Sequence, residues 1–368
     1  MAKVTFYPLG NADSYLIQTD QNRLFLFDFA EMKNPDDISD KRILLKESLK
    51  DDIGWPNRKS IDVLVISHGD NDHVKGISNT FWLDHAKKYQ DSDKIIINEL
   101  WVPAALIVEE GSEDDTRIIR QEARYRFLNK KGIKVFARPE HLNDWLKSNN
   151  KQLDDYRDLI CDAGKTVPGW TIIDDAIEFF VHAPFAERTD NGILDRNTNS
   201  IVIQISIYSC GNITKLLSTG DTVKEQWEKI VQITRYHNRD EKLEWDIFKI
   251  PHHCSYLAMS DKKGSYVTIP TKEFQWLLDQ GAKNGILIST SDDISMTTTQ
   301  QPPHIEAYRK YQEISKRLDA DLVVTMEHPE KKNPQRLVIL IDGNGSSLKK
   351  VISSPSIITT SQRAPRAG

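Results

Sequence analysis

The sequence predicts an α/β protein in which several strands end in side chains that can bind metal ions or transfer protons. Short apolar runs typical of buried strands alternate with amphipathic segments typical of helices. The chain has 368 residues, of which 39% are hydrophobic and 28% charged, so it can bury a large core as an ordinary globular protein does. Three of the apolar runs end in aspartate or histidine. The same segments therefore predict both the fold class and a candidate site.

The predicted strands form one block in each half of the chain. They cover residues 3–8, 14–19, 23–29, 61–66 and 94–101, and then 170–182, 200–208, 213–219 and 245–250. The segments 38–52, 74–90 and 222–235 are predicted to be helices between these strands.

Residues 103–165 are predicted to form a helical elaboration. In the segment 109–131, Ser112 and Asp115 match a capping box, acids crowd the start, and two lysines followed by a glycine mark the end. Residues 140–165 carry an apolar stripe on a polar background. We interpret the elaboration as a cover packed on the sheet. The alternatives are a wall of a substrate groove and a docking surface for a protein partner.

The segment 65–76 is the most informative part of the chain. Its apolar strand runs directly into four metal-ligand side chains, which are His68, Asp70, Asp72 and His73. Four imidazole and carboxylate groups this close together need water or a cation to satisfy them. The pattern therefore favours a metal site over a solvated acidic turn. It is not an EF-hand, because Lys75 stands where that loop requires glycine.

Two later apolar runs end in a similar way. One ends in Gly-Asp at Asp221, and the other ends in the paired histidines His252 and His253. Residues at the ends of buried strands emerge on one edge of a sheet, so three strand ends can deliver ligands to one place. A binuclear metal site is the leading hypothesis.

The order of these motifs extends over residues 4–342. It comprises His-x-Asp-x-Asp-His at 68–73, Asn197-Thr-Asn-Ser-Ile-Val-Ile, Leu-Ser-Thr-Gly-Asp221 and Lys249-Ile-Pro-His-His-Cys-Ser255. This order resembles the metallo-β-lactamase superfamily and, more narrowly, the hydrolase domain of the ComEC/Rec2 competence proteins. The resemblance implies an αββα sandwich over residues 1–345. The basic composition of residues 346–368, with many Ser, Thr, Ile and Pro residues, predicts a flexible tail.

The resemblance also implies ligands for two divalent ions. His68 and Asp70 would belong to the first ion and Asp72 and His73 to the second, while Asp221 would bridge them and His252 or His253 would complete the set. Zn²⁺ and Mn²⁺ are the expected ions, with Mg²⁺ as an alternative, because carboxylates harden the site. The ions would activate a hydroxide for attack on a phosphodiester.

The first ion is expected to be the more weakly held. Most relatives carry a further histidine where this chain has Asn197 and Asn199, and His182 is considered as a replacement ligand.

The resemblance also implies residues that support the chemistry. Asp28 would orient the metal loop without binding metal, and Asn199 and Ser255 would orient their own loops. His304, which follows two prolines, would act with Asp72 in catalysis by contacting a phosphate oxygen or protonating the leaving group.

Charge and composition limit the function classes. The net charge of −5 argues against indiscriminate binding to nucleic acid, although a bound cation can dominate the field of its site. The absence of a long apolar run predicts no membrane segment, and three cysteines suit a cytoplasmic location. The metal-ligand pattern predicts a metal-dependent hydrolase, and the resemblance to the competence branch implies that it is a phosphodiesterase or nuclease acting on DNA. The alternatives are hydrolysis of a small ester or cyclic nucleotide, and a non-catalytic regulatory component with a structural metal site.

Overall fold

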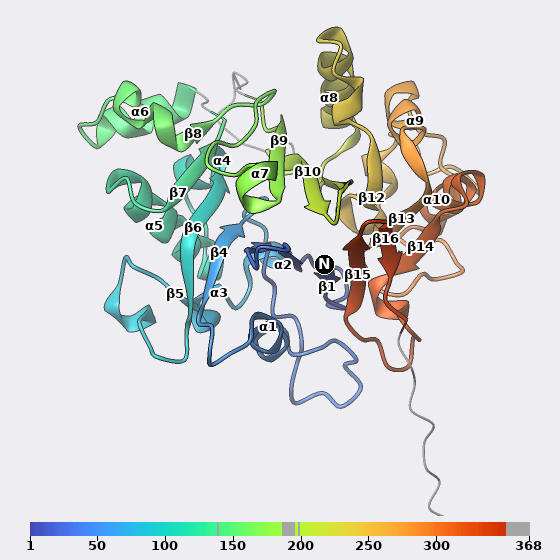
Figure 1. Cartoon of the computed structure of the whole chain (residues 1–368), viewed down its shortest axis with the longest axis horizontal. Helices are drawn as coiled ribbons and strands as arrows, with labels where there is room; N and C mark the ends of the chain where they lie inside the picture. The colour runs from blue at the N-terminus through green and yellow to red at the C-terminus, as the bar shows by residue number, and fades with distance from the viewer. Residues whose placement is uncertain (138–139, 186–195, 198, 351–368) are drawn as a thin grey trace, which may run out of the picture.

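The computed structural model describes residues 1–137, 140–185, 196–197 and 199–350, and within these it contains two mixed β-sheets (Figure 1). Strand order in the first sheet is β16-β15-β1-β2-β3-β4-β6-β7-β8, with β5 paired to β6, and in the second sheet it is β14-β13-β12-β11-β10-β9. The first sheet comprises β1 (Ala2–Phe6), β2 (Tyr15–Gln18), β3 (Leu24–Phe27), β4 (Ser60–Val65), β5 (Phe81–Trp82), β6 (Ile95–Pro103), β7 (Ile133–Phe136), β8 (Ile160–Cys161), β15 (Leu337–Asp342) and β16 (Gly345–Leu348). The second comprises β9 (Ile177–Ala183), β10 (Val202–Ser209), β11 (Asn212–Ser218), β12 (Trp245–Lys249), β13 (Gly281–Ser289) and β14 (Asp321–Val324).

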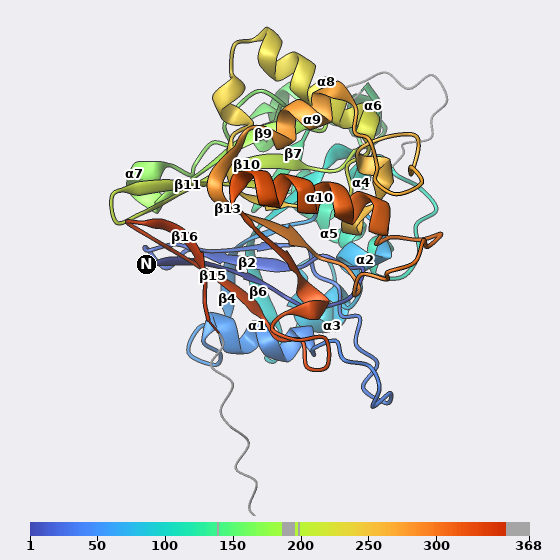
Figure 2. The same ribbon diagram turned by 90° about the vertical axis from the view of Figure 1, so that its right-hand side faces the viewer.

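The helices lie outside the two sheets. They are α1 (Leu45–Ile53), α2 (Asn71–Val74), α3 (Ile77–Thr80), α4 (Ala104–Val108), α5 (Asp114–Leu128), α6 (Glu140–Ser148), α7 (Ile172–Asp175), α8 (Lys224–Tyr236), α9 (Lys272–Leu278) and α10 (Ile305–Leu318). Short 3-10 helices cover Lys87–Tyr89, Leu153–Leu159, Asp240–Lys242, His252–Cys254, Tyr256–Ala258 and Thr325–Glu327. In Figure 2, α8, α9 and α10 lie on one side of the sheets and α1 on the other.

Three apolar layers hold this arrangement together. Between the sheets, Phe25 of β3 and Trp101 of β6 each place their rings 4.9 Å from the ring of Phe179 on β9. The outer face of the first sheet packs against α1, α3, α4, α5 and α6. The outer face of the second sheet packs against α8, α9 and α10. The predicted α/β fold with αββα layers is therefore confirmed.

Two element predictions were wrong. Residues 74–90 are not one helix, because Gly76 adopts a φ of +87° and the chain then forms α3 and β5. Val74 of α2 and Ile77 of α3 face the core from short helices, and Phe81 faces it from a short strand paired with β6. The segment 103–165 is not wholly helical, since β7 and β8 within it extend the first sheet by parallel pairing.

Two further boundaries differ from those predicted. The strand predicted at 170–182 begins at Ile177, and α7 precedes it with its start capped by the Thr171 hydroxyl, which accepts from the Asp174 amide. At the other end of the chain, β16 continues to Leu348 in antiparallel pairing with β15. The rest of the predicted tail, residues 351–368, lies outside the described residues.

The topology brings four strand ends to one rim. Parallel β3 and β4 run into Asp28 and His68, and parallel β11 and β12 run into Asp221 and the paired histidines. The two sheets meet there, because the Ile201 amide donates to the Ser67 carbonyl over 3.0 Å. In the described residues, no helix has the length and apolar character needed to cross a membrane.

Candidate metal centre

Four side chains from three segments of the chain bring potential ligand atoms together at this rim. One ligand atom from each lies within 4.8 Å of the others in the set Asp72, His73, Asp221 and His253. Asp221 is central: its Oδ1 lies 3.4 Å from His73 Nε2 and its Oδ2 lies 3.4 Å from His253 Nε2. His253 Nε2 also lies 3.2 Å from Asp72 Oδ2. We call these four residues the compact group.

The donors of the compact group fit a divalent ion. His73 Nε2 and Asp221 Oδ1 are buried and, in the described part of the protein, form no hydrogen bond although they face each other. A buried polar atom without a partner costs free energy, and a cation between nitrogen and oxygen would satisfy both atoms. Two carboxylates and two imidazoles are ligands that suit zinc or manganese.

The electrostatics of the compact group favour a cation. Burial opposes ionisation of Asp221, but the positive charges of His253 and His73 hold its pKa well below its usual range. Burial opposes a charged His253, yet Asp221 and Asp72 raise its pKa to about 10. The carboxylates that retain a proton on this imidazole would equally attract a metal ion, so metal and proton compete for the site.

Asp28 occupies the supporting position that the sequence suggested. Its Oδ2 lies 2.9 Å from His73 Nδ1, and the carboxylate accepts from both the amide and the hydroxyl of Ser67 at 2.7 Å. The contact turns the other ring nitrogen, Nε2, toward Asp221. A carboxylate behind a ligating histidine fixes the ring and raises its basicity.

A second group, Asp13, Asp28 and His73, also brings ligand atoms within 4.8 Å. Its carboxylates already have partners, since Asp13 pairs with the buried Lys249 ammonium and accepts from the Thr290 hydroxyl. His73 would have to use Nδ1, which faces Asp28. We therefore interpret this group as support for the compact group and not as a second ion site.

The side chains expected at the first ion form no compact group, although His68 Nε2 is buried without a hydrogen bond in the described residues. His68 Nε2 lies 3.4 Å from Asp70 Oδ2, but Asp70 Oδ1 accepts from Arg196 Nη1 at 2.7 Å. Burial raises the pKa of Asp70, and hydrogen bonds and charge from His68 and Arg196 outweigh it and lower that pKa overall. In the described residues, His68, Asp70 and His252 join no group of three close ligand atoms.

The paired histidines have different surroundings. His253 enters the compact group through Nε2, and its Nδ1 lies 2.7 Å from the Thr290 carbonyl, which fixes the ring. His252 leaves Nδ1 buried and without a hydrogen bond in the described structure. Of the two, only His253 belongs to the compact group, so the geometry favours His253 as its ligand, a choice that the sequence left open.

His182 does not reach the candidate centre, so its consideration as a ligand is corrected. Its Nε2 contacts the Lys242 carbonyl at 2.7 Å, and burial lowers its pKa to about 4. Side chains alternate along a strand. Because Phe179 and Val181 face the core between the sheets, His182 faces outward beside Phe180.

The remaining predicted residues lie in loops around the centre. Ser255 accepts from the Leu257 amide and thereby orients its loop. Asn199 is half-buried in the turn before β10, and its amide donates to the Arg196 carbonyl at 3.2 Å. His304 is buried, with Nδ1 3.4 Å from the Tyr256 amide and Nε2 3.3 Å from the Gln300 carbonyl. These contacts suit a loop-positioning role for His304 better than the expected proton transfer.

The elaboration holds residues 68–78, the segment that carries His68, Asp70, Asp72 and His73 and that we call the ligand loop. The sequence did not predict this contact. Asp115 of α5 accepts from the amides of Gly76 at 2.7 Å and Ser78 at 3.0 Å, while Thr116 donates to the Gly69 carbonyl at 2.8 Å. The predicted capping box was wrong, because α5 starts after Glu113 without a side-chain cap. The carboxylate assigned to the cap serves the loop instead.

Lys249 and Asp13 were also missed as supporting residues. Lys249 is 1% exposed within an apolar strand, and a lysine almost never occupies such a position without an acidic partner. That local signal was available in the sequence. The sequence could not identify Asp13 as the partner of Lys249, because Asp13 lies more than 200 residues earlier in the chain.

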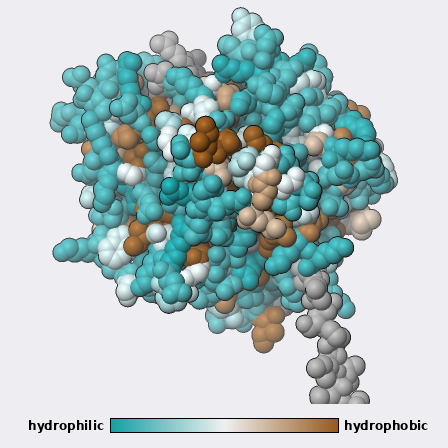
Figure 3. Space-filling view, in the orientation of Figure 1, coloured by the Kyte–Doolittle hydropathy of each residue, from teal (hydrophilic) through white to brown (hydrophobic). Residues whose placement is uncertain are grey.

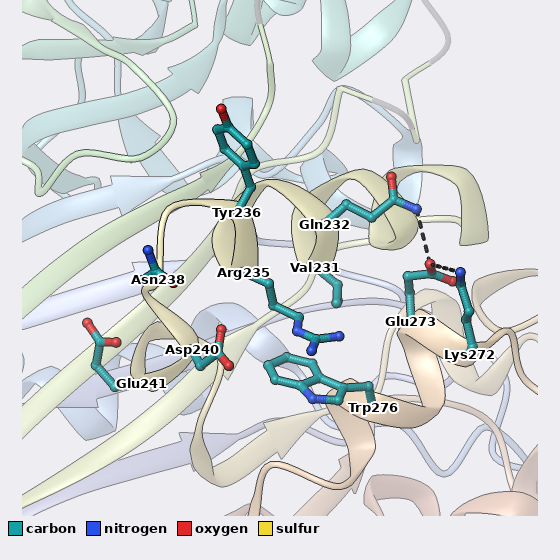
Figure 4. A pocket seen from close by; sticks show the side chains of 10 residues that line it. All are labelled: Val231, Gln232, Arg235, Tyr236, Asn238, Asp240, Glu241, Lys272, Glu273 and Trp276. Atoms are coloured by element: carbon teal, nitrogen blue, oxygen red, sulfur yellow. Dashed lines mark hydrogen bonds and ion pairs between the residues drawn. The ribbon is translucent and has the colours of Figure 1, made fainter.

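A separate pocket of about 910 Å³ lies between α8 and α9 (Figure 4). The guanidinium of Arg235 lies 4.7 Å from the ring centre of Trp276 at its wall. None of the residues lining it belongs to the compact group. Elsewhere on the face drawn in Figure 3, apolar side chains form small patches in a mainly hydrophilic surface. The fold and the compact group together define an αββα protein with a candidate metal centre at one rim.

Comparison with known proteins gives similarities of structure alone. No family model matches the chain, and no curated protein sequence matches it. The chain is similar to unliganded yeast PDE1, with 10% identity, 88% of this chain and 96% of that chain covered, and a TM-score of 0.43.

Two further solved structures are similar. For Zn²⁺-bound PqqB from Methylobacterium extorquens the identity is 10%, the coverage 88% and 98%, and the TM-score 0.38. For the class B3 di-zinc metallo-β-lactamase LRA-12 from an Alaskan soil metagenome the values are 12%, 86% and 91%, and 0.33. Similarities this low carry no argument about function, which therefore rests on the geometry of the site.

Proposed function

We propose that this protein is a metal-dependent hydrolase of the metallo-β-lactamase superfamily that cleaves phosphodiesters. The observation that carries the proposal is the compact group, in which buried ligand atoms of His73 and Asp221 face each other without a hydrogen bond. The order of motifs along the chain and the αββα layers support the choice of superfamily.

The metal would be held by Asp72, His73, Asp221 and His253. When bound, such an ion lowers the pKa of a water molecule and offsets negative charge on phosphoryl oxygens. Asp28 keeps the Nε2 atom of His73 directed at Asp221, and the Thr290 carbonyl does the same for His253. The chain thus supplies ligands whose orientation is fixed before metal or substrate arrives.

DNA is the first substrate to test. This choice rests on the resemblance to the competence hydrolases and on the hard carboxylate ligands, which suit Mn²⁺. The overall charge of −5 disfavours long-range attraction of a polyanion, so we expect affinity to come from cations close to the centre.

The test is hydrolysis of bis(p-nitrophenyl) phosphate and of single- and double-stranded DNA, with and without Mn²⁺. Asp221→Asn should reduce turnover by about a thousandfold or more, because it removes the acid central to the group. The matched control is Asp175→Asn, a buried acid of α7 that contacts the Thr171 amide. Full turnover in folded Asp221→Asn would refute the proposal. Turnover of cyclic nucleotides or carboxyl esters, with DNA left intact, would change the substrate class, and metal binding without any turnover would favour a regulatory role.

A further inference from the structure

Arg196 is already bound to one of the expected metal ligands. Its Nη1 donates to Asp70 Oδ1 over 2.7 Å, and its Nε donates to Glu109 Oε1 over 2.8 Å. Its Nη2 donates to the same Glu109 oxygen. Glu109 directly follows α4, so the elaboration holds the guanidinium beside the ligand loop.

The two halves of the centre differ in the cations beside their carboxylates: Asp70 pairs with an arginine, whereas Asp72 and Asp221 pair with His253. In the compact group, His73 Nε2 and Asp221 Oδ1 are buried and form no hydrogen bond in the described structure, and a cation between them would satisfy both atoms. In the other half, Asp70 accepts from Arg196, which supplies its positive charge, although His68 Nε2 and His252 Nδ1 are also buried without a hydrogen bond in the described residues. A divalent ion binding Asp70 there would have to lie close to the guanidinium charge, and like charges repel strongly at such short range.

We propose that Arg196 provides the second positive charge of this site, beside a single divalent ion in the compact group, and that it binds phosphoryl oxygens of the substrate. The inference rests on the proposed function and deepens it. It also replaces the expectation of two metal ions with one ion and one fixed guanidinium.

The chemistry of the guanidinium suits this role. Arginine stays charged at every physiological pH, and its planar fork matches pairs of phosphate oxygens. Asp70 and Glu109 accept from three of its five N–H groups. With a side chain 32% exposed, Arg196 is held by two acids and still borders solvent, where a substrate arrives.

Metal stoichiometry tests the inference without measuring activity. Equilibrium dialysis against Mn²⁺, followed by elemental analysis, should give one ion per chain for the wild type. Arg196→Gln should bind two, because Asp70 and Glu109 lose their cation while His68 Nε2 remains 3.4 Å from Asp70. Arg196→Lys, which keeps the charge, should bind one. The matched control Arg124→Gln, an arginine of α5 that contacts the Glu109 carbonyl and not Asp70, should also bind one.

Electron paramagnetic resonance gives a second reading, since two neighbouring Mn²⁺ ions couple and a single ion does not. Two ions in the wild type, or one in Arg196→Gln, would overturn the inference while leaving the proposed function intact. A wild type that binds no Mn²⁺ would overturn both.

Phosphate binding tests the contact with substrate. With one equivalent of Mn²⁺ present, calorimetry should show inorganic phosphate binding to Arg196→Gln at least about tenfold more weakly than to wild type, since hydrogen bonds to charged groups are worth that much. Arg124→Gln should match the wild type. Equal affinity in Arg196→Gln would overturn the proposed contact.

Discussion

The Nδ1 atom of His73 lies 2.9 Å from Oδ2 of Asp28, and this contact decides which ring nitrogen faces Asp221. Asp28 follows β3, while His73 lies in α2 beyond the end of the neighbouring strand β4. The parallel pairing of β3 with β4 thus fixes the orientation of a candidate ligand. Burial opposes a charged His73, but the charges of Asp28 and Asp221 raise the pKa of its imidazole well above the usual range.

Asp28→Asn should weaken Mn²⁺ binding by about 10- to 100-fold, which is the usual effect of removing a carboxylate behind a ligating histidine. The overall fold should persist, because the asparagine can still accept from Ser67. Isothermal titration with Mn²⁺ measures the change, and Asp175→Asn serves as the buried-acid control. Unchanged affinity in Asp28→Asn would show that His73 needs no such orientation or binds no metal.

Asp115→Asn should loosen the ligand loop. The charged carboxylate accepts from the Gly76 and Ser78 amides, so its neutralisation should lower the free energy of unfolding by about 1 kcal/mol. Hydrogen exchange of residues 70–80 should become faster, and Mn²⁺ affinity should fall. The exposed neighbour Asp114, changed to Asn, is the control. Identical exchange in both variants would remove the elaboration from our account of the site.

Glu122→Gln should destabilise the elaboration by about 3 kcal/mol, because the buried carboxylate accepts from the amides of Asp84 and His85, from His85 Nδ1 and from Arg126 Nε. Burial opposes ionisation, but these partners lower the pKa of Glu122 from 4.5 to about 2. An acid whose pKa is lower in the folded state than in the unfolded state stabilises the fold fully at pH values above its unfolded-state pKa. For Glu122 this stabilisation disappears as the pH falls from about 4.5 toward 2. Denaturant unfolding across that range should show a shallower acid decline in Glu122→Gln than in wild type; equal slopes would count against the ion-pair network.

His182→Gln should leave metal affinity unchanged, because this side chain faces Phe180 and the Lys242 carbonyl. Burial lowers the pKa of His182 from 6.5 to about 4, so the fold holds a neutral ring. Its contribution to stability is complete above about pH 6.5 and is lost as the pH falls toward 4. Thermal unfolding should therefore depend less on pH in the variant over that range. A loss of Mn²⁺ binding in His182→Gln would restore this residue as a ligand.

The gathering of strand ends at one rim could be predicted from sequence because it follows from local patterns. Apolar runs ending in Asp28, His68, Asp221 and His253 mark buried strands, and parallel pairing brings their ends to one edge. The αββα layers followed from the alternation of strands and helices together with the resemblance.

The errors occurred where tertiary contacts overrode a local signal. Asp115 matched a cap, yet it binds the ligand loop 37 to 39 residues away. The segment 74–90 had a helical pattern, but its residues Phe81–Trp82 pair with β6.

The pairing of Arg196 with Asp70 spans 126 residues. No periodicity or spacing indicates such a contact, because it depends on how the loop before β10 meets the loop after β4. Asp13 and Lys249 lie similarly far apart. A single sequence therefore identified most ligands at the rim and missed most of the groups that compensate their charge.

The most direct test of the central claim is anomalous diffraction from crystals of the protein grown with Mn²⁺. Our account predicts an anomalous peak within bonding distance of Asp72, His73, Asp221 and His253, the four side chains whose ligand atoms converge. A peak located instead between Asp13 and Asp28, or no peak at this rim in metal-saturated crystals, would contradict it.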